Sequence, residues 1–217
     1  LVESARRNAE LGNERVALFE VARVYLPSGA ELPDERWHVA GVTEGGFFRA
    51  KGAVETLYAA LALQATFERT RREGLHPGKA AAVPHGWVGE LHPAVLSGGW
   101  GAWELDLDAL ALDVRGAHAY EDVVTYPAVR QDLAFVVPED VAAGDLVEAA
   151  RTAAGELREM RPFDVYRGDQ VPEGHKSIAF RVAFQSPERT LSDEDARAIR
   201  ECVVAELARR FGAELRA

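Results

Sequence analysis

The residues with the clearest chemical potential lie in one alternating run near the C-terminus. Between residues 176 and 185, large apolar side chains at every second position alternate with Ser177, Ala179, Arg181 and Ala183. A period of two predicts a β-strand with one buried face. Because serine and alanine add little bulk, the backbone of another molecule can approach the second face closely, and an arginine there can bind phosphate. The run therefore predicts a binding platform.

The elements needed to hold this strand follow from the surrounding patterns. Strand patterns at 132–137, 159–167, 176–185 and 213–216 alternate with helical patterns at 142–154 and 192–211. Ser192 with Asp195 predicts a capping box at the start of the second helix, and Gly212 predicts its end. The resulting order, βαββαβ, is that of a ferredoxin-like domain. With both helices on one side, the four-stranded sheet would leave its other face open.

Alternation assigns the side chains of these strands to two faces. The predicted core-facing set is Leu133, Phe135, Val137, Phe163, Val165, Ile178, Phe180, Val182, Phe184 and Leu215. The predicted open set is Asp132, Ala134, Asp164, Tyr166, Ser177, Ala179, Arg181, Ala183 and Arg216. Aromatic stacking combined with guanidinium groups is typical of surfaces that hold single-stranded RNA. The open set is equally compatible with a sheet face that meets only water.

The N-terminal half predicts a separate α+β domain with a mainly antiparallel sheet. Strand patterns lie at 16–26, 37–43, 65–71, 80–83, 87–91 and 102–107, with helical patterns at 1–12 and 48–63. His92 and Pro93 predict the start of a further short helix. Residues 108–128 mix Ala, Asp, Gly and His and predict the boundary. We therefore expect two domains, residues 1–119 and 120–217.

Composition limits the partners that the chain can have. The 217 residues carry a net charge of −10, and acidic residues outnumber basic ones in both halves, which argues against sequence-blind binding of polyanions. Any contact with RNA must come from the local placement of a few groups. The single cysteine, Cys202, excludes an internal disulfide and favours a cytoplasmic protein. No apolar run approaches the ~20 residues of a membrane span, and the charged opening is unlike a signal peptide.

No motif predicts catalysis, a metal or a cofactor within this chain. The glycine pair Gly45-Gly46 is too weak a signal for a phosphate loop. Asp106 and Asp108 could hold a cation, but a solvated strand end is the favoured interpretation. Three histidines recur at spacings that match no short ligand motif, and their Pro- and Gly-rich surroundings favour turns. These are His76, His85 and His92. His175, at the start of the alternating strand, is a candidate phosphate contact.

Several motifs in the right order identify a family resemblance. They are Tyr126-Pro127 with Arg130-Gln131-Asp132, FDVYRG at 163–168, EGHKSIAF at 173–180, RTLSDEDA at 189–196 and FGAELR at 211–216. With them, residues 120–217 resemble the ferredoxin-fold anticodon-binding domain that ends the β subunit of bacterial phenylalanyl-tRNA synthetase. LFEVARVY at 18–25, the Lys51-Gly52 helix, LHPGKAA at 75–81 and VGELHP at 88–93 resemble the preceding synthetase-like module.

The resemblance implies a function for each part. Residues 1–119 would be a class II synthetase-like module, incomplete at its N-terminus, that has lost its catalytic residues and packs against the α subunit. Residues 120–217 would bind the anticodon stem-loop of tRNA(Phe). The whole enzyme would be an (αβ)₂ heterotetramer that ligates phenylalanine to tRNA with ATP and Mg²⁺, while this part holds no cofactor of its own.

The resemblance and the face assignment together give a candidate RNA-binding set. We expect Arg181, Tyr166 and Arg216 to contact the anticodon loop from the sheet. The rim would steer phosphates through Arg130, Lys176 and Arg189, and the surface is completed by Asp132, Ser177 and Ala179. Two other classes remain open. One is a regulatory ACT-like domain that binds a small molecule, although residues 138–144 are acidic and lack its close glycine. The other is a purely structural docking module.

Overall fold

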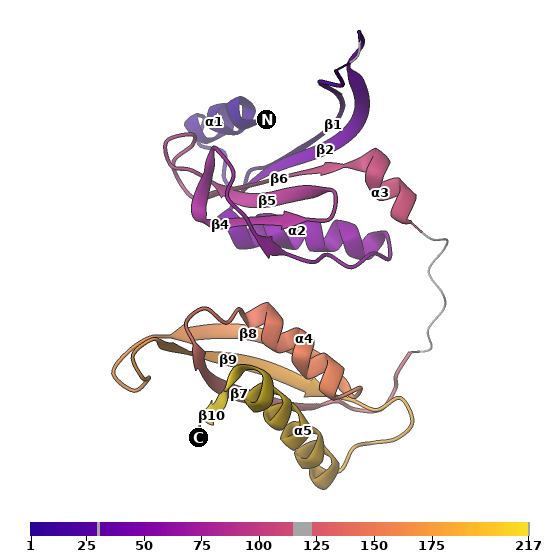
Figure 1. Cartoon of the computed structure of the whole chain (residues 1–217), viewed down its shortest axis with the longest axis vertical. Helices are drawn as coiled ribbons and strands as arrows, with labels where there is room; N and C mark the ends of the chain where they lie inside the picture. The colour runs from indigo at the N-terminus through magenta and orange to yellow at the C-terminus, as the bar shows by residue number, and fades with distance from the viewer. Residues whose placement is uncertain (30, 115–122, 217) are drawn as a thin grey trace. The chain divides into compact units, whose positions relative to one another are not determined.

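The computed structural model of the chain describes residues 1–29, 31–114 and 123–216 (Figure 1). It divides into two compact units, Leu1–Ala119 and Tyr120–Ala217. Both contain antiparallel sheets with helices, so the predicted α+β class is confirmed. Among the described residues, no helix combines the length and the apolar character that crossing a bilayer requires.

The first unit is built on a six-stranded antiparallel sheet. Its elements are α1 (Val2–Glu10), β1 (Ala17–Leu26), β2 (Asp34–Glu44), α2 (Gly46–Ala60), β3 (Glu68–Arg69), β4 (Leu75–Val83), β5 (Gly86–Leu91), β6 (Trp100–Asp106) and α3 (Leu107–Asp113). The strand order is β1-β2-β6-β5-β4-β3. Helix α2 packs on β5, β6 and β2, where Val54, Tyr58 and Leu105 are almost fully buried (Figure 1). Strand β1 therefore extends the sheet beyond the helix.

Three local predictions for the first unit differ from the structure. Residues 107–113, where the sequence predicts the end of a strand and then the domain boundary, form α3. The Asp106 side chain caps this helix by accepting a hydrogen bond from the Ala109 amide at 3.0 Å. The strand predicted at 65–71 is reduced to β3. The helix predicted at His92 is only a turn, in which the Val95 and Leu96 amides both donate to the His92 carbonyl.

The second unit has the predicted βαββαβ order. Its elements are β7 (Val129–Pro138), α4 (Ala143–Ala153), β8 (Leu157–Tyr166), β9 (His175–Phe184), α5 (Asp193–Phe211) and β10 (Glu214–Arg216). The sheet order is β10-β7-β9-β8, all antiparallel, and both helices cover the same face (Figure 1). Phe135 and Phe180 lie at the centre of the core, with their rings edge to face and the ring centres 6.2 Å apart. Leu146 of α4 and Leu207 of α5 belong to the same core.

The ends of α5 follow the predicted signals. The Ser192 side chain accepts a hydrogen bond from the Asp195 amide, and the Asp195 carboxylate accepts one from the Ser192 amide, which completes the capping box. Gly212 ends the helix in the left-handed conformation, with φ of 63°. Because these signals are local, the sequence was sufficient to place this helix.

Candidate nucleic-acid interface

The strand register of the second unit defines the sheet face that the helices leave uncovered. Residues paired directly across neighbouring strands point to the same side of a sheet. Since Phe135, Ile178 and Phe180 point into the core, the residues that alternate with them point away from the helices. We call this surface the open face. Its rows, read across β7, β9 and β8, are Asp132, Arg181 and Arg161; Ala134, Ala179 and Asp164; and Val136, Ser177 and Tyr166.

The prediction that Phe163 faces the core is wrong. The pairing of β8 with β9 shifts between Pro162 and Asp164, which leaves Phe163 as an extra residue in a bulge. Its side chain is 53% exposed, and the guanidinium carbon of Arg181 lies 5.3 Å from the centre of its ring. Because Arg181 belongs to the open face, the bulge brings an aromatic ring beside that face.

Two further residues predicted for the core are half exposed. Val165 pairs with Ile178, and Leu215 pairs with Phe135, so both have the expected register. However, β8 and β10 are the two edges of the sheet, where the helices cover less surface. Alternation assigns a face correctly, but it does not say how far the covering layer reaches.

Arg216 crosses the open face from one edge of the sheet to the other. Its guanidinium carbon lies 5.5 Å from the centre of the Tyr166 ring, and the same group donates a hydrogen bond to the Gln170 side chain. Since β10 and β8 are opposite edges, the Arg216 side chain spans β7 and β9, where alanines leave room for it. Ser177, which pairs with Tyr166, is only 4% exposed, so its predicted accessibility is wrong.

The small residues of the open face are also less accessible than predicted near Ala183, toward the end of β9. Ala183 is 4% exposed although its register places it on the open face. Its cross-strand neighbours are Arg130 and Glu159, and its strand neighbours on the same face are Arg181 and Gln185. A methyl group flanked by four long side chains is shielded by them. Ala134 and Ala179 are the partly accessible alanines that remain in the centre.

Arg181 remains accessible in the middle of the open face. Its Nε donates to Asp132 Oδ1 at 3.3 Å, and both side chains are more than half exposed. Such an exposed pair contributes little to stability. Among the hydrogen bonds of the described residues, none uses the two terminal nitrogens of Arg181. These nitrogens can therefore donate hydrogen bonds to an anion.

The three predicted rim residues have different environments. Arg130 is exposed on β7, opposite Ala183. Lys176 is only 7% exposed, because it pairs with the buried Val137 and points toward the helix side of the sheet. Its Nζ donates to the Glu139 carbonyl at 2.7 Å. The predicted placement of Lys176 at an accessible rim is therefore wrong.

Arg189 is exposed, but its guanidinium is already bound to the start of α5. Its two terminal nitrogens donate to the Asp195 carboxylate at 2.6 and 2.8 Å. These hydrogen bonds, together with those from the backbone and side chain of Ser192, hold the pKa of Asp195 well below its usual range. Arg189 thus stabilises the cap in the free protein.

Two arginines of this region were not among the predicted site residues. Arg167 forms a bidentate ion pair with Glu139, with distances of 2.6 to 3.1 Å, and the Arg167 hydrogen bond lowers the pKa of Glu139. Arg161 lies on the open face directly opposite Arg181. Strict alternation along β8 from Tyr166 would place residue 162 on the open face, but the bulge places residue 161 there instead. Only the structure could place this residue.

The candidate cation-binding groups have ordinary structural partners. Asp106 accepts from Arg36 at 3.0 Å as well as from α3, and Asp108 accepts from the Trp37 amide at 2.8 Å. His76 and His92 each accept from a backbone amide two residues later, as expected in turns, whereas His85 contacts Asp113 at 2.6 Å. Within the described ranges, no group of three or more potential ligands could hold a metal ion.

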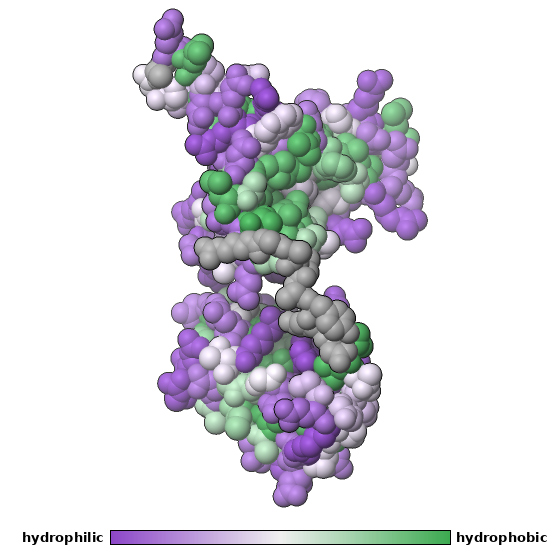
Figure 2. Space-filling model, turned by 90° about the vertical axis from the view of Figure 1, so that its right-hand side faces the viewer, coloured by the Kyte–Doolittle hydropathy of each residue, from purple (hydrophilic) through white to green (hydrophobic). Residues whose placement is uncertain are grey.

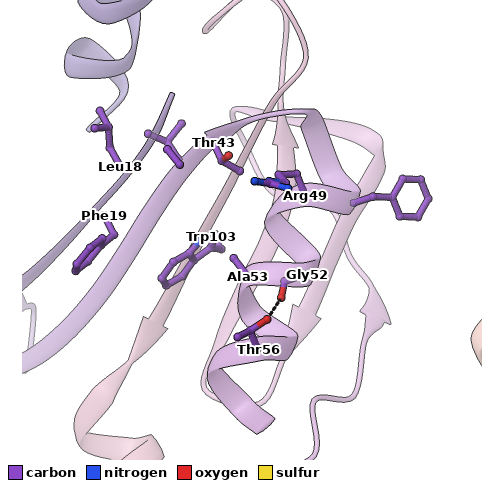
Figure 3. Close-up of a pocket in the computed structure, with 11 residues that line it drawn as sticks. Leu18, Phe19, Thr43, Arg49, Gly52, Ala53, Thr56 and Trp103 are labelled. Atoms are coloured by element: carbon purple, nitrogen blue, oxygen red, sulfur yellow. Dashed lines mark hydrogen bonds between the residues drawn. The ribbon is translucent and has the colours of Figure 1, made fainter. Parts of the chain in front are cut away.

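The first unit carries an apolar groove rather than a polar platform. The groove lies between α2 and the uncovered margin of the sheet, and has a volume of about 640 Å³ (Figure 3). Its walls include Phe19 from β1, Trp103 from β6 and Phe48 from α2. Phe19 is 73% exposed and Phe48 is 83% exposed. Figure 2 shows hydrophobic residues gathered on one face of this unit, the upper one in the view, whereas the lower unit is more mixed.

A glycine in β2 shapes the floor of this groove. Gly41 pairs with Trp103, and a Cβ at Gly41 would lie 2.5 Å from the indole ring. The missing side chain therefore lets Trp103 lie flat against β2. Arg49 and Thr56 of α2 complete the opposite wall (Figure 3).

Each unit is similar to a known protein family. Residues 124–216 match the family described as "Ferredoxin-fold anticodon binding domain". Residues 1–106 match the family described as "Phenylalanyl tRNA synthetase beta chain CLM domain". The second unit is thus similar to an anticodon-binding family, and the first is similar to a module of the phenylalanyl-tRNA synthetase β chain.

The whole chain is similar to the β subunits of phenylalanine–tRNA ligases. It is 37% identical to the β subunit of Geobacillus kaustophilus and 39% identical to that of Thiobacillus denitrificans, in each case over 100% of the chain and 30% of the relative. The β subunit of Moorella thermoacetica is 36% identical with the same coverage. The chain thus spans about 30% of the length of these curated relatives.

Proposed function

We propose that the second unit binds the anticodon stem-loop of tRNA(Phe) as part of a phenylalanine–tRNA ligase. The assignment takes residues 120–217 as the anticodon-binding domain and residues 1–119 as a non-catalytic synthetase-like module. The complete enzyme would be a cytoplasmic (αβ)₂ heterotetramer that joins phenylalanine to its tRNA with ATP and Mg²⁺. Both cofactors would act at the α subunit.

The observation that carries this proposal is the pairing of guanidinium groups with aromatic rings on one face of a sheet. Arg181 lies beside Phe163, and Arg216 lies beside Tyr166, with two partly accessible alanines in the centre of the same face. Unpaired bases stack on aromatic rings and on guanidinium planes, and arginine forks bind phosphate oxygens. The open face therefore offers both interactions that a single-stranded loop requires.

Anisotropy titration of the assembled enzyme with a labelled anticodon stem-loop tests the role of Arg181. Replacement Arg181→Ala is expected to weaken binding by at least about tenfold, because it removes both a phosphate contact and a stacking partner. The matched control is Arg197→Ala, which removes the same charge from the exposed side of α5. Equal affinity of the wild type and both the Arg181→Ala and Arg216→Ala variants would contradict the proposal.

The apolar groove supports the second part of the proposal, which is assembly with the α subunit. Large exposed apolar surfaces mark protein interfaces, and aromatic side chains are enriched among the residues that contribute most to binding. The groove contains Phe19, Phe48 and Trp103, and its polar lining is limited to Thr43, Arg49 and Thr56. A protein partner suits this lining better than RNA does.

The ACT-like alternative has less support from the same observations. Two pockets found among the described residues, the apolar groove and a hollow along α1, are lined by the first unit alone, and the match of residues 124–216 is to an anticodon-binding family. Calorimetric titration of this chain with free phenylalanine would separate the two functions. Saturable binding that Arg181→Ala leaves unchanged would favour the alternative.

A further inference from the structure

Two arginines meet across the centre of the open face. Arg161 on β8 pairs directly with Arg181 on β9, while Asp132 flanks Arg181 on the other side. Directly opposed residues of antiparallel strands have Cβ atoms roughly 5 Å apart. The two guanidinium groups therefore leave the sheet side by side, and like charges in such a pair destabilise it.

The charges of this pair are not balanced by bidentate carboxylate partners, as those of two other arginines in the unit are. Arg167 is bound bidentately by Glu139, and Arg189 is bound bidentately by Asp195. By contrast, the Arg161 side chain has neither an ion pair nor a hydrogen bond among the residues that the structure describes. Within the part of the chain that the structure describes, the one ion pair of Arg181 is the 3.3 Å contact from its Nε to Asp132 Oδ1.

Two acidic residues lie near Arg161 on the same strand without forming ion pairs with it. Glu159 pairs with Ala183 one row away, and Asp164 pairs with Ala179 on the other side of the bulge. Both are exposed, and neither carboxylate comes within ion-pair distance of Arg161. They lower the net charge of the face but leave the terminal nitrogens of both arginines accessible.

From this geometry we propose that Arg161 and Arg181 form a two-arginine clamp for one backbone phosphate of the bound RNA. A phosphate between them would accept hydrogen bonds from both forks and cancel their repulsion. Phe163, held beside Arg181 by the bulge, would stack on the base attached to the clamped phosphate. Arg161 is then a positioning residue for the loop. This inference rests on the proposed function and adds a residue and a phosphate contact to it.

The clamp makes two opposite predictions for the same substitution. Arg161→Ala removes an unpaired like charge, so the free protein is expected to be at least as stable as the wild type in thermal unfolding. The same change is expected to weaken binding of the anticodon stem-loop to the assembled enzyme by about tenfold. It should also lower the slope of log affinity against log salt by roughly 0.7, the value for one phosphate contact in a single strand.

The variant set separates failure of the clamp from failure of the proposed function. Arg197→Ala on α5 and Arg151→Ala on α4 are the matched controls, because both are exposed arginines on the helices that cover the opposite face of the sheet. Weakening by Arg161→Ala and by Arg181→Ala, with unchanged controls, supports the clamp. If Arg181→Ala weakens binding but Arg161→Ala changes neither affinity nor salt slope, the clamp is wrong and the RNA-binding face stands. If neither substitution has an effect, the proposed function fails with it.

Discussion

Both units are antiparallel sheets with helices, but they leave different surfaces uncovered. In the first unit α1 and α2 pack on opposite faces of the sheet, and α2 leaves the β1 margin of its face uncovered. In the second unit both helices pack on one face and leave the other open. In the first unit the uncovered margin is apolar, with Phe19 and Trp37 at its surface. In the second unit the uncovered face carries arginines and aspartates around small residues and one tyrosine. Under the proposed function, the fold fixes where a partner would bind, and the side chains of each uncovered surface favour protein in the first unit and RNA in the second.

The largest expected effect is that of a core substitution on the free energy of unfolding. It tests whether covered residues contribute more to stability than uncovered ones. Phe180 is fully buried, so Phe180→Ala is expected to cost about 3–5 kcal/mol of unfolding free energy. Phe163→Ala, at the bulge, should cost about 0.5 kcal/mol, as for an exposed site. Denaturant unfolding of the chain measures both, and amide exchange assigns the loss to the second unit. Equal costs would show that Phe163 is buried and that the bulge is wrong.

The groove of the first unit provides the second test. Phe19→Ala is expected to weaken association with the α subunit by about 2 kcal/mol, roughly 30-fold, because an exposed aromatic that becomes buried in an interface is a typical hot spot. Sedimentation of the mixed subunits measures the assembly. The control is Leu112→Ala on α3, since Leu112 is 85% exposed and does not line the groove. A stem-loop affinity that falls while assembly is unchanged would reverse the assignment of the two surfaces.

The smallest effect concerns acid stability and should be confined to the second unit. The pKa of Asp195 is lowered in the folded state, so its ionisation stabilises the fold above the unfolded pKa of about 3.9. That stability is lost progressively as the pH falls below this value. The Asp195→Asn variant should therefore be less stable than the wild type at pH 7, and the difference should shrink toward pH 2.

Amide exchange measured unit by unit gives the control for this pH dependence. Amide protection of α5 should fall in the Asp195→Asn variant, whereas that of α2 should not change. The start of α2 depends instead on Glu90, whose Oε2 accepts a hydrogen bond from the Phe47 amide at 3.3 Å. The Glu90 pKa is lowered chiefly by a hydrogen bond from Lys79, so the first unit has its own acid response. A loss of protection in both units on Asp195→Asn would show that they unfold together.

Much of this protein follows from local sequence patterns. The alternation of β9 correctly predicted that Ile178, Phe180, Val182 and Phe184 enter the core and that Arg181 does not. The capping box and Gly212 placed α5, and the order of elements predicted the ferredoxin-like sheet. These features depend on residues within a few positions of one another, where periodicity and capping energies act directly.

Tertiary structure alone decided the details of the candidate site. The bulge in β8 moves Phe163 out of the core and aligns Arg161 with Arg181. Strict alternation along a strand cannot predict the position at which a bulge interrupts it. Arg216 covers part of the open face because β10 and β8, distant in sequence, are opposite edges of one sheet. Lys176 lies on the same side of β9 as Ile178, and its burial depends on the β7–α4 turn, where the Glu139 carbonyl accepts a hydrogen bond from its ammonium group. Each of these depends on a contact between segments far apart in the chain, which local patterns do not encode.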